Sequence, residues 1–407
     1  MTREEQTKKI YEASQAFTPS SPVDDIDLFA GRQKEVQKIV GAIGQKGQHV
    51  VIFGERGVGK TSLTNVLSEI LELIAPSDEY VIRVNADSSS TPASLWRSVL
   101  REVPLATARK KVGFSNEQEV QDETGTLADK IPDDVSPEEI RHLFQTLDSK
   151  FVIIFDELDR VKIKKTVASL SDTIKALSDH AVAVTLILVG VADSVEDLVQ
   201  NHPSIERALV QIQMPRMTKA EGQELVTRGL KKFGMNIEDG ALERIARLSQ
   251  GLPHYTHLLA LNAAKEAINA DSDTIFISYV KTATMRAVEQ AEQSIRKAYH
   301  AAVISSRGNL YPQVLLACAL AEVDDLGFFK AGAVREPMKR ITEKDYEIAA
   351  FARHLTDFCS KERGPILQKT GHRGRFRYRF INPTMQPYII MKGLAEKMVE
   401  EEFWDLA

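Results

Sequence analysis

Eight residues near the start of the chain have the composition and spacing of a loop that binds phosphate. They read GERGVGKT over positions 54–61, between an apolar run and a helical pattern. Glycines let backbone N–H groups turn inward around phosphate oxygens, and the start of a helix adds positive potential. We expect Lys60 to reach the terminal phosphates and the Thr61 hydroxyl to bind Mg²⁺. The residues expected to contact a nucleotide here are Gly54, Glu55, Arg56, Gly57, Val58, Gly59, Lys60, Thr61 and Ser62.

A second pair of residues suited to nucleotide chemistry follows the apolar run from Phe151 to Phe155. Asp156 and Glu157 are adjacent carboxylates at the end of that predicted strand, where parallel sheets bind ligands. There Asp156 can hold Mg²⁺ through water, and Glu157 can act as the base that orients or deprotonates an attacking water. The pair therefore favours hydrolysis of a nucleotide over its storage.

The elements that must position these residues alternate along the first half of the chain. Apolar runs typical of buried strands occur at 49–53, 80–85, 151–155, 182–190 and 208–214, with helical patterns between them. Strands that are apolar on both faces and separated by helices are typical of a parallel sheet covered on both sides. The sequence thus predicts an α/β fold that carries both motifs at one edge of its sheet.

Other stretches flank this core. Residues 1–26 predict an amino-terminal arm with a short helix, and residues 110–137 are polar and acidic, so we interpret them as an insertion or mobile loop. After Pro215, three helical segments predict a small lid, and Thr218 with Glu221 forms a capping box at the first of them. A long helix is expected from 277 to 305.

The C-terminal part has an excess of positive charge. Residues 295–392 carry 17 Lys and Arg against 9 Asp and Glu, a net charge of +8, whereas the rest of the chain carries −13. Such an excess suits a polyanionic partner, although a merely solvated basic face is the alternative. The predicted parts are an arm (1–26), an α/β core (27–216), a lid with a connecting helix (217–294), a basic unit (295–392) and an acidic tail (393–407).

Composition excludes several classes of protein. The chain has 407 residues, 43% of them apolar and 27% charged, which is typical of a globular protein with two to four folded units. Cys318 and Cys359 lie far apart, which gives no support to a zinc site or a disulfide framework. The longest apolar stretch, 181–192, is too short to span a bilayer, and no signal peptide is recognisable. We therefore expect a cytoplasmic protein with no membrane partner.

The basic unit reads as three helices followed by a hairpin. Helical patterns occur at 310–321, 334–341 and 343–361, and the hairpin covers 366–381. In its second strand three arginines alternate with three aromatic residues, so one face packs and the other is cationic. The residues expected to contact phosphate are Lys369, Arg373, Arg375, Arg377 and Arg379.

The order of these motifs resembles that of AAA+ ATPases. The sequence Leu28-Phe-Ala-Gly-Arg32, the phosphate loop, Asp156-Glu157 and the Ser204-Ile-Glu-Arg207 segment before a strand occur in the same succession. Within that superfamily the chain is similar to the origin-recognition and replication-initiator branch, over about residues 22–268. The resemblance implies a P-loop NTPase core with a helical lid, and ATP as the nucleotide bound with Mg²⁺.

The resemblance also implies roles for single residues. Leu28 to Arg32 matches the segment beside the adenine, with an ordinary helix start as the alternative. Asp193, or its neighbour Ser194, falls where the family places a polar sensor of the γ-phosphate. Arg207 matches the arginine finger that completes a neighbouring subunit's site, which implies self-association; a surface salt bridge is the alternative. His254 stands where an arginine usually contacts the γ-phosphate, and a neutral imidazole would give a weaker, pH-dependent contact there; an ordinary residue at the start of a helix is the alternative.

The C-terminal pattern looks like a winged helix, the domain that replication initiators of this branch use on DNA. The resemblance therefore implies an ATP-controlled switch that binds duplex DNA and assembles on it. However, winged helices also dock proteins, and Gly251-Leu-Pro253 is similar to a motif of STAND signalling NTPases. A STAND-like switch that recruits a protein partner remains the alternative function.

Overall fold

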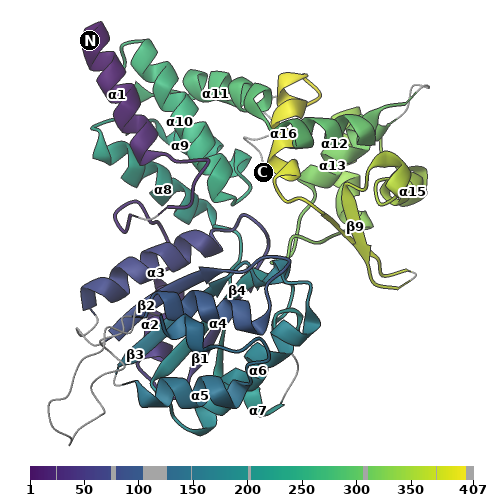
Figure 1. The fold of residues 1–407 in the computed structure, drawn as a ribbon. Coiled ribbons are helices and arrows are strands. Elements are labelled where there is room, and N and C mark those ends of the chain that lie inside the picture. Colours follow the sequence, from purple (N-terminus) through teal and green to yellow (C-terminus); the bar gives the residue numbers. More distant parts are fainter. Residues whose placement is uncertain are drawn as a thin grey trace, which may run out of the picture.

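The computed structural model describes residues 1–23, 25–74, 79–103, 126–147, 149–199, 203–305, 310–372 and 374–399. A five-stranded sheet in the order β2-β3-β4-β1-β5 forms the centre of the α/β core, and every pair of neighbours is parallel (Figure 1). Its strands are β1 (His49–Gly54), β2 (Glu79–Asn85), β3 (Lys150–Asp156), β4 (Val184–Val191) and β5 (Leu209–Gln213). The predicted α/β sheet is confirmed.

The two faces of the sheet enter different hydrophobic clusters, because alternate side chains of a strand point in opposite directions. Ile52 and Ile154 pack on the face of α2 and α3, whereas Val51 and Phe155 pack with Trp96 on the other. The helices around the sheet are α2 (Gln33–Ile43), α3 (Lys60–Ile74), α4 (Pro92–Arg101), α5 (Pro137–Thr146), α6 (Lys164–Asp179) and α7 (Pro203–Glu206), with short 3₁₀ turns η2 (Leu127–Lys130), η3 (Leu158–Arg160) and η4 (Val195–Asp197).

The interpretation of residues 110–137 as an insertion or mobile loop is wrong for its second part. Leu127, Ile131 and Val135 are buried in the cluster that contains Trp96, and η2 packs against α4. These three apolar residues are spaced four positions apart, but acidic residues lie between them, so the sequence pattern did not indicate that they are buried. Residues 104–125, which include the rest of the stretch, lie outside the described residues.

The lid lies above the carboxyl edge of the sheet and carries the amino-terminal arm. Its elements are α8 (Lys219–Lys232), β6 (Asn236–Ile237), α9 (Asp239–Leu248), α10 (Pro253–Asn269), β7 (Thr274–Ile275) and α11 (Ile277–Gln290). The arm begins with α1 (Arg3–Ala16), which packs along α10 and α8 (Figure 1). Phe17 is fully buried, and a Cβ at Gly229 of α8 would lie 2.4 Å from its ring. The arm is thus docked on the lid.

The expected long helix from 277 to 305 is divided in two, which corrects that prediction. Ala291 and Glu292 adopt extended ψ angles of 140° and 144°, so α11 ends and α12 (Gln293–Val303) begins. Both helices pack on α16, but α11 also packs on α10 and α9 of the lid, whereas α12 packs on α13 of the C-terminal unit.

The C-terminal unit contains helices and a three-stranded antiparallel sheet in the order β8-β10-β9. Its elements are α12, α13 (Tyr311–Leu320), β8 (Phe329–Lys330), η5 (Ala331–Val334), α14 (Arg335–Thr342), α15 (Ile348–Asp357), η6 (Lys361–Arg363), β9 (Leu367–Thr370), β10 (Arg377–Phe380) and α16 (Met385–Ala395). The expected helix over 343–361 begins only at Ile348, because Glu343 adopts a left-handed φ of +56° that ends α14. The short strand β8 is an addition that the sequence pattern did not indicate.

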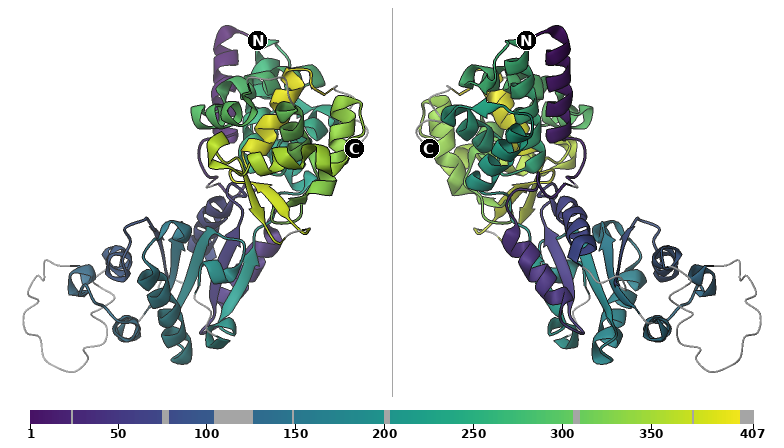
Figure 2. Two further views of the ribbon diagram at one scale, coloured as in Figure 1. Left: turned by 90° about the vertical axis from the view of Figure 1, so that its right-hand side faces the viewer. Right: turned by 90° about the vertical axis from the view of Figure 1, so that its left-hand side faces the viewer.

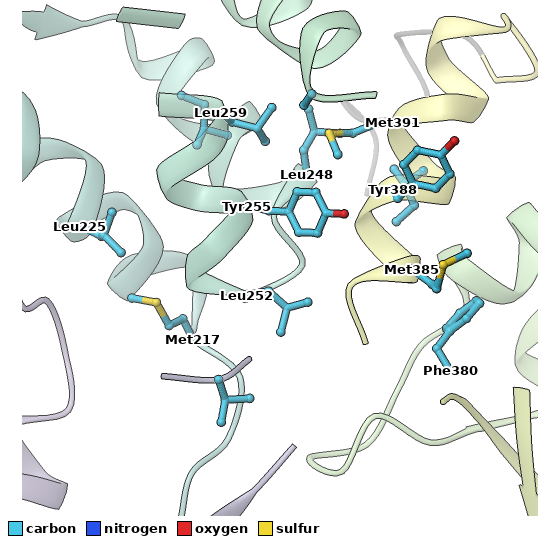
Figure 3. Packing of buried hydrophobic residues seen from close by; sticks show 14 of the residues in the cluster. Met217, Leu225, Leu248, Leu252, Tyr255, Leu259, Phe380, Met385, Tyr388 and Met391 are labelled. Carbon is cyan, nitrogen blue, oxygen red and sulfur yellow. The ribbon is translucent and has the colours of Figure 1, made fainter. Parts of the chain in front are cut away.

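The lid and the C-terminal unit share one hydrophobic core. Tyr255 and Leu259 of α10 face Tyr388 and Met391 of α16 (Figure 3), and the Tyr255 hydroxyl donates to the Thr384 carbonyl at 2.9 Å. Figure 2 shows the sheet at one end of the molecule and these two parts together at the other. Within the described ranges, no helix has the length and apolar character that crossing a bilayer requires.

Candidate functional site

The loop between β1 and α3 has the backbone that a phosphate-binding loop needs. Gly54 has a φ of +150°, and a Cβ there would lie 2.4 Å from the Met214 carbonyl oxygen, so no side chain fits. Gly57 and Gly59 have φ of +85° and +97°, which other residues rarely adopt. The loop is followed directly by α3, which begins at Lys60. The backbone N–H groups at the start of a helix are available to bind an anion.

Lys60 is buried at the centre of this loop. Its ammonium donates to the carbonyl oxygens of Gly54 at 3.0 Å and Glu55 at 2.9 Å. Burial lowers the pKa of Lys60 to about 8, although the carboxylates of Asp159 and Asp156 favour the charged form. The cation is therefore held inside the loop at the position where an anionic ligand would meet it.

Asp156 and Glu157 lie at the carboxyl end of β3, as predicted, beside this loop. Asp156 is buried, and its carboxylate accepts from the Arg83 guanidinium at 2.7 Å and from the Glu157 N–H at 2.8 Å. Glu157 has a left-handed φ of +59°, which turns its half-exposed side chain into solvent, where the carboxylate accepts from Arg160 at 2.6 Å. The two carboxylates thus have different environments, one buried and paired, the other accessible.

A magnesium ion fits the chemistry of this edge. The hydroxyl of Thr61 and the carboxylate of Asp156 are hard oxygen donors that border the same cavity, as Mg²⁺ prefers. Within the described part of the chain, no three His, Cys, Asp or Glu side chains gather as a metal site.

A cavity of about 870 Å³ joins the loop, the carboxylates and the lid. The predicted residues that line it are Arg56, Gly57, Gly59, Lys60, Thr61, Ser62, Asp156, Glu157 and His254. Gly54 and Glu55 do not line it, and contribute instead the carbonyls that hold Lys60. Lining residues that the sequence reasoning missed are Thr18–Val23 of the arm, Asp159, Arg160, Gly190, Val191, Pro253 and His257.

A second, narrow cavity of about 30 Å³ shares part of this lining and is mostly apolar. It is lined by Val23, Leu28, Phe29, Ala30, Arg32, Val58, Gly59, Ser62, Met214, Met217, Leu225, Pro253 and His257. The predicted adenine segment, Leu28 to Arg32, therefore does border the site. Arg32 precedes α2, but it is buried and its guanidinium donates to the Pro215 carbonyl, so the alternative of a helix start with Arg32 in solvent is wrong in that respect.

Three residues that the resemblance assigned to the nucleotide lie in different places. His254 lines the large cavity, and its Nδ1 lies 2.7 Å from the Pro19 carbonyl of the arm. Asp193 does not line the cavity and instead pairs with Arg379 of the C-terminal unit. Arg207 is exposed just before β5, at the amino end of the strands and so away from the P-loop of its own chain. Its predicted role concerns a neighbouring subunit and stays a prediction.

A buried ion pair connects the phosphate loop with the C-terminal unit. The Arg216 guanidinium donates to both carboxylate oxygens of Glu55, at 2.6 and 2.9 Å, and the two side chains are only 14% and 7% exposed. Arg216 also donates to the Gln386 side chain of α16 at 2.6 Å. Gln386 in turn donates to the Ala319 carbonyl at 2.8 Å, which fixes it within the C-terminal unit.

The cationic face of the hairpin is only partly free. Arg379 is bound to Asp193 at 2.5 Å, and Arg377 is bound to Asp324 at 3.1 Å. Arg375 and Lys369 are exposed, although the Lys369 ammonium lies 3.6 Å from the centre of the Phe376 ring. Arg373 lies outside the described residues. The predicted alternation holds within β10, where Tyr378 and Phe380 are buried, whereas Phe376 precedes the strand and is only partly buried.

Comparison of the sequence with protein families gives one match that spans most of the chain. The profile of the family described as Novel STAND NTPase 1 matches residues 11–297. The chain belongs to this family. In this STAND NTPase the matched region contains the phosphate loop, the Asp156–Glu157 pair, the lid and all of the arm that borders the cavity. The C-terminal unit lies almost wholly beyond it.

This STAND NTPase is also similar to archaeal replication proteins. It is 22% identical over 332 residues to an ORC1-type DNA replication protein of Thermoplasma volcanium, covering 78% of this chain and 74% of that protein. It is 24% identical over 221 residues to the ORC1-type DNA replication protein 2 of Thermoplasma acidophilum, or 52% of this chain and 50% of that one. The predicted resemblance to the origin-recognition branch is therefore confirmed.

Among solved structures, the ORC2 protein of Aeropyrum pernix in its ADPNP and ADP complexes has a similar fold. The TM-score is 0.50 at 13% sequence identity, and the alignment covers 94% of this chain and 98% of that one. At this level of identity the likeness concerns the fold alone. It extends over the C-terminal unit, which the family profile does not reach.

Proposed function

We propose that this STAND NTPase binds and hydrolyses ATP with Mg²⁺, and that the bound nucleotide controls how its C-terminal unit binds duplex DNA. One observation carries the proposal. A single cavity is lined by the phosphate loop, the two carboxylates and the lid, and the lid shares its hydrophobic core with the basic C-terminal unit.

Each residue of the cavity would have a distinct task. Lys60 would leave its two carbonyl partners to bind the terminal phosphates, while Thr61 and Asp156 would hold Mg²⁺, which supplies positive charge to the phosphates. Glu157 would orient and deprotonate the attacking water. In the present arrangement Arg160 holds its carboxylate, so this ion pair would have to open, or shift, before Glu157 can meet a water.

The nucleotide would act on the C-terminal unit through two routes. The first is mechanical, because His254 and Pro253 line the cavity and belong to α10, whose Tyr255 packs against α16. The second is electrostatic, because Glu55 of the phosphate loop is paired with Arg216, and Arg216 holds Gln386. A nucleotide can shift this arrangement only by binding its alternative states with different affinity.

The DNA-binding element would be the hairpin together with α15, as in a winged helix. Lys369, Arg375, Arg377 and Arg379, together with Arg373, would contact phosphates rather than bases. Arg207 would complete the site of a neighbouring subunit after assembly. The order of α13, α14, α15 and the three-stranded sheet supports this reading.

A second function is favoured by the family itself. The C-terminal unit would then dock a protein, as a STAND-like signalling switch requires, and its arginines would serve contacts within the chain. The pairs Arg379–Asp193 and Arg377–Asp324 support this alternative, because they neutralise two of the cations that DNA would need.

Fluorescence anisotropy of labelled duplex DNA decides between the two. It is measured over a salt series with ATP, ADP or no nucleotide, and repeated with Arg375, Arg377 and Arg379 changed to Ala. The matched control removes three exposed lysines of the α/β core, Lys34, Lys38 and Lys46.

We expect nucleotide-dependent binding that weakens steeply with salt, with a salt slope lower by up to about 3 in the arginine variant. The lysine control should bind like the unmodified protein. Absence of binding at low salt in every nucleotide state would reject the DNA function and favour a protein partner.

A further inference from the structure

His257 is a buried histidine whose protonation pattern is fixed by its surroundings. It lies on α10 and is 3% exposed, with its ring edge-on to Phe17 at a centroid distance of 6.0 Å. Its Nδ1 accepts a hydrogen bond of 3.3 Å from the Thr18 N–H. Since Nδ1 is an acceptor, the proton of the neutral ring must be on Nε2. Burial, with a smaller contribution from His254, lowers the pKa of His257 to about 4, so the ring is neutral at physiological pH.

The Nε2–H of His257 has no hydrogen-bond partner among the described residues, although it is buried. Buried donors almost always have a partner, because desolvating one without replacing its bond to water is costly. His257 borders both the large cavity and the narrow apolar one. An unused donor on a residue that lines both a phosphate site and an apolar cavity is suited to the recognition of a nucleotide's base.

We propose that the His257 Nε2–H recognises a purine base by donating a hydrogen bond to one of its unprotonated ring nitrogens. The inference rests on the nucleotide-binding function proposed above. The narrow cavity has Leu28, Val58 and Met214 in its lining, which suit a flat heteroaromatic ring and exclude phosphate. The narrow cavity has a volume of about 30 Å³, which is too small for a purine. The base would therefore enter only when the arm or the lid moves away from the core. On entry, the base would accept the hydrogen bond from the His257 Nε2–H.

The experiment compares base analogues by isothermal titration calorimetry on the full chain. ADP is used rather than ATP, so that hydrolysis cannot interfere, together with the 1-deaza, 3-deaza and 7-deaza forms, each of which lacks one ring nitrogen. We expect one deaza analogue to bind about tenfold or more weakly than ADP, because it leaves the donor buried and unpaired. In His257→Leu this analogue and ADP should bind equally, and in His257→Gln, which retains an N–H donor, the difference should partly return.

His49 supplies a matched control. It too is fully buried, its Nδ1 accepts from the Leu186 N–H at 2.9 Å, and its Nε2 has no partner among the described residues. It begins β1, at the opposite end of that strand from the phosphate loop. His49→Leu should therefore leave the discrimination between ADP and the deaza analogues unchanged, whatever it does to stability.

Three results would overturn the inference. If the unmodified protein binds all three deaza analogues as tightly as ADP, the donor does not recognise the base, and the inference alone is rejected. If the discrimination persists in His257→Leu, another residue is responsible. Failure to bind any nucleotide would reject both this inference and the proposed function.

Discussion

The ion pair between Glu55 and Arg216 gives the sharpest test of how the phosphate loop is tied to the C-terminal unit. We consider three variants: Glu55→Gln, Arg216→Met and the two combined. Arg216→Met removes the salt-bridge partner that the Glu55 carboxylate, which is 7% exposed, has among the described residues. Glu55→Gln leaves Arg216 with the Gln386 side chain at 2.6 Å and the Gln250 carbonyl at 3.4 Å.

The magnitudes follow from these differences in pairing. Removing one partner of a buried ion pair costs about 3–5 kcal/mol of stability, and we expect this full cost for Arg216→Met. Glu55→Gln should cost less, about 2 kcal/mol, because Arg216 retains two hydrogen-bond acceptors. The combined variant removes both charges of the pair and should cost no more than Arg216→Met alone. The coupling energy is then about 2 kcal/mol.

Thermal unfolding followed by the fluorescence of Trp96 is a suitable assay. Trp96 is 1% exposed and packs against Phe155 of β3, so it reports on the α/β core. Trp404 is changed to Phe in every variant, which leaves Trp96 as the only tryptophan. For a domain of this size, a loss of 3–5 kcal/mol lowers the melting temperature by about 10 °C. Two results would refute the reasoning: additive losses of stability in the double-mutant cycle, or single changes that each cost under about 0.5 kcal/mol. Either would mean that loss of one partner does not leave a costly buried charge.

Four further predictions concern the nucleotide and DNA. Lys60→Ala should weaken ADP binding about 100-fold or more in calorimetry, because it removes the cation that meets the phosphates. In the unmodified protein, ADP affinity should fall above pH 8, by up to about tenfold per pH unit, since burial places the pKa of Lys60 at about 8 and its ammonium is lost above that value. Glu157→Gln should lower ATP turnover about 10²- to 10⁴-fold in a phosphate-release assay while ADP binds normally; normal turnover would reject Glu157 as the base. Asp193→Asn should release Arg379 and tighten DNA binding a few-fold in anisotropy, and an unchanged affinity would mean that this arginine does not touch DNA.

The phosphate loop and the strand before Asp156 could be predicted from the sequence, because each is defined by residues that lie close together in the chain. Gly54, Gly59 and Lys60 form a pattern in which each residue type has a stated geometric need, and the strand before Asp156 is an uninterrupted apolar run. Such features depend on neighbours within a few positions, so they can be read without knowing the rest of the chain.

What could not be predicted depends on contacts between distant segments. Thr18 and His257 are 239 positions apart, and no local pattern indicates that a turn-rich arm lies against the lid beside the cavity. Arg379 illustrates the same limit, because strand alternation correctly placed it opposite the aromatic face but gave no sign of Asp193. The break at Ala291 was missed because neither Gly nor Pro marks it; it separates a helix that packs on α9 and α10 of the lid from one that packs on α13.

The arm also acts as a tether of fixed length. At one end Phe17 is held in the lid, where the absence of a side chain at Gly229 makes room for its ring; at the other, the Val23 N–H donates to Ser62 of α3 at 3.1 Å. Six residues, fully extended, reach about 20 Å. The lid can therefore separate from the core by no more than this distance while both ends remain attached. Any wider opening must first break the Val23–Ser62 hydrogen bond or extract Phe17 from the lid, and a methyl group added at position 229 would weaken the second attachment, because it would collide with the Phe17 ring.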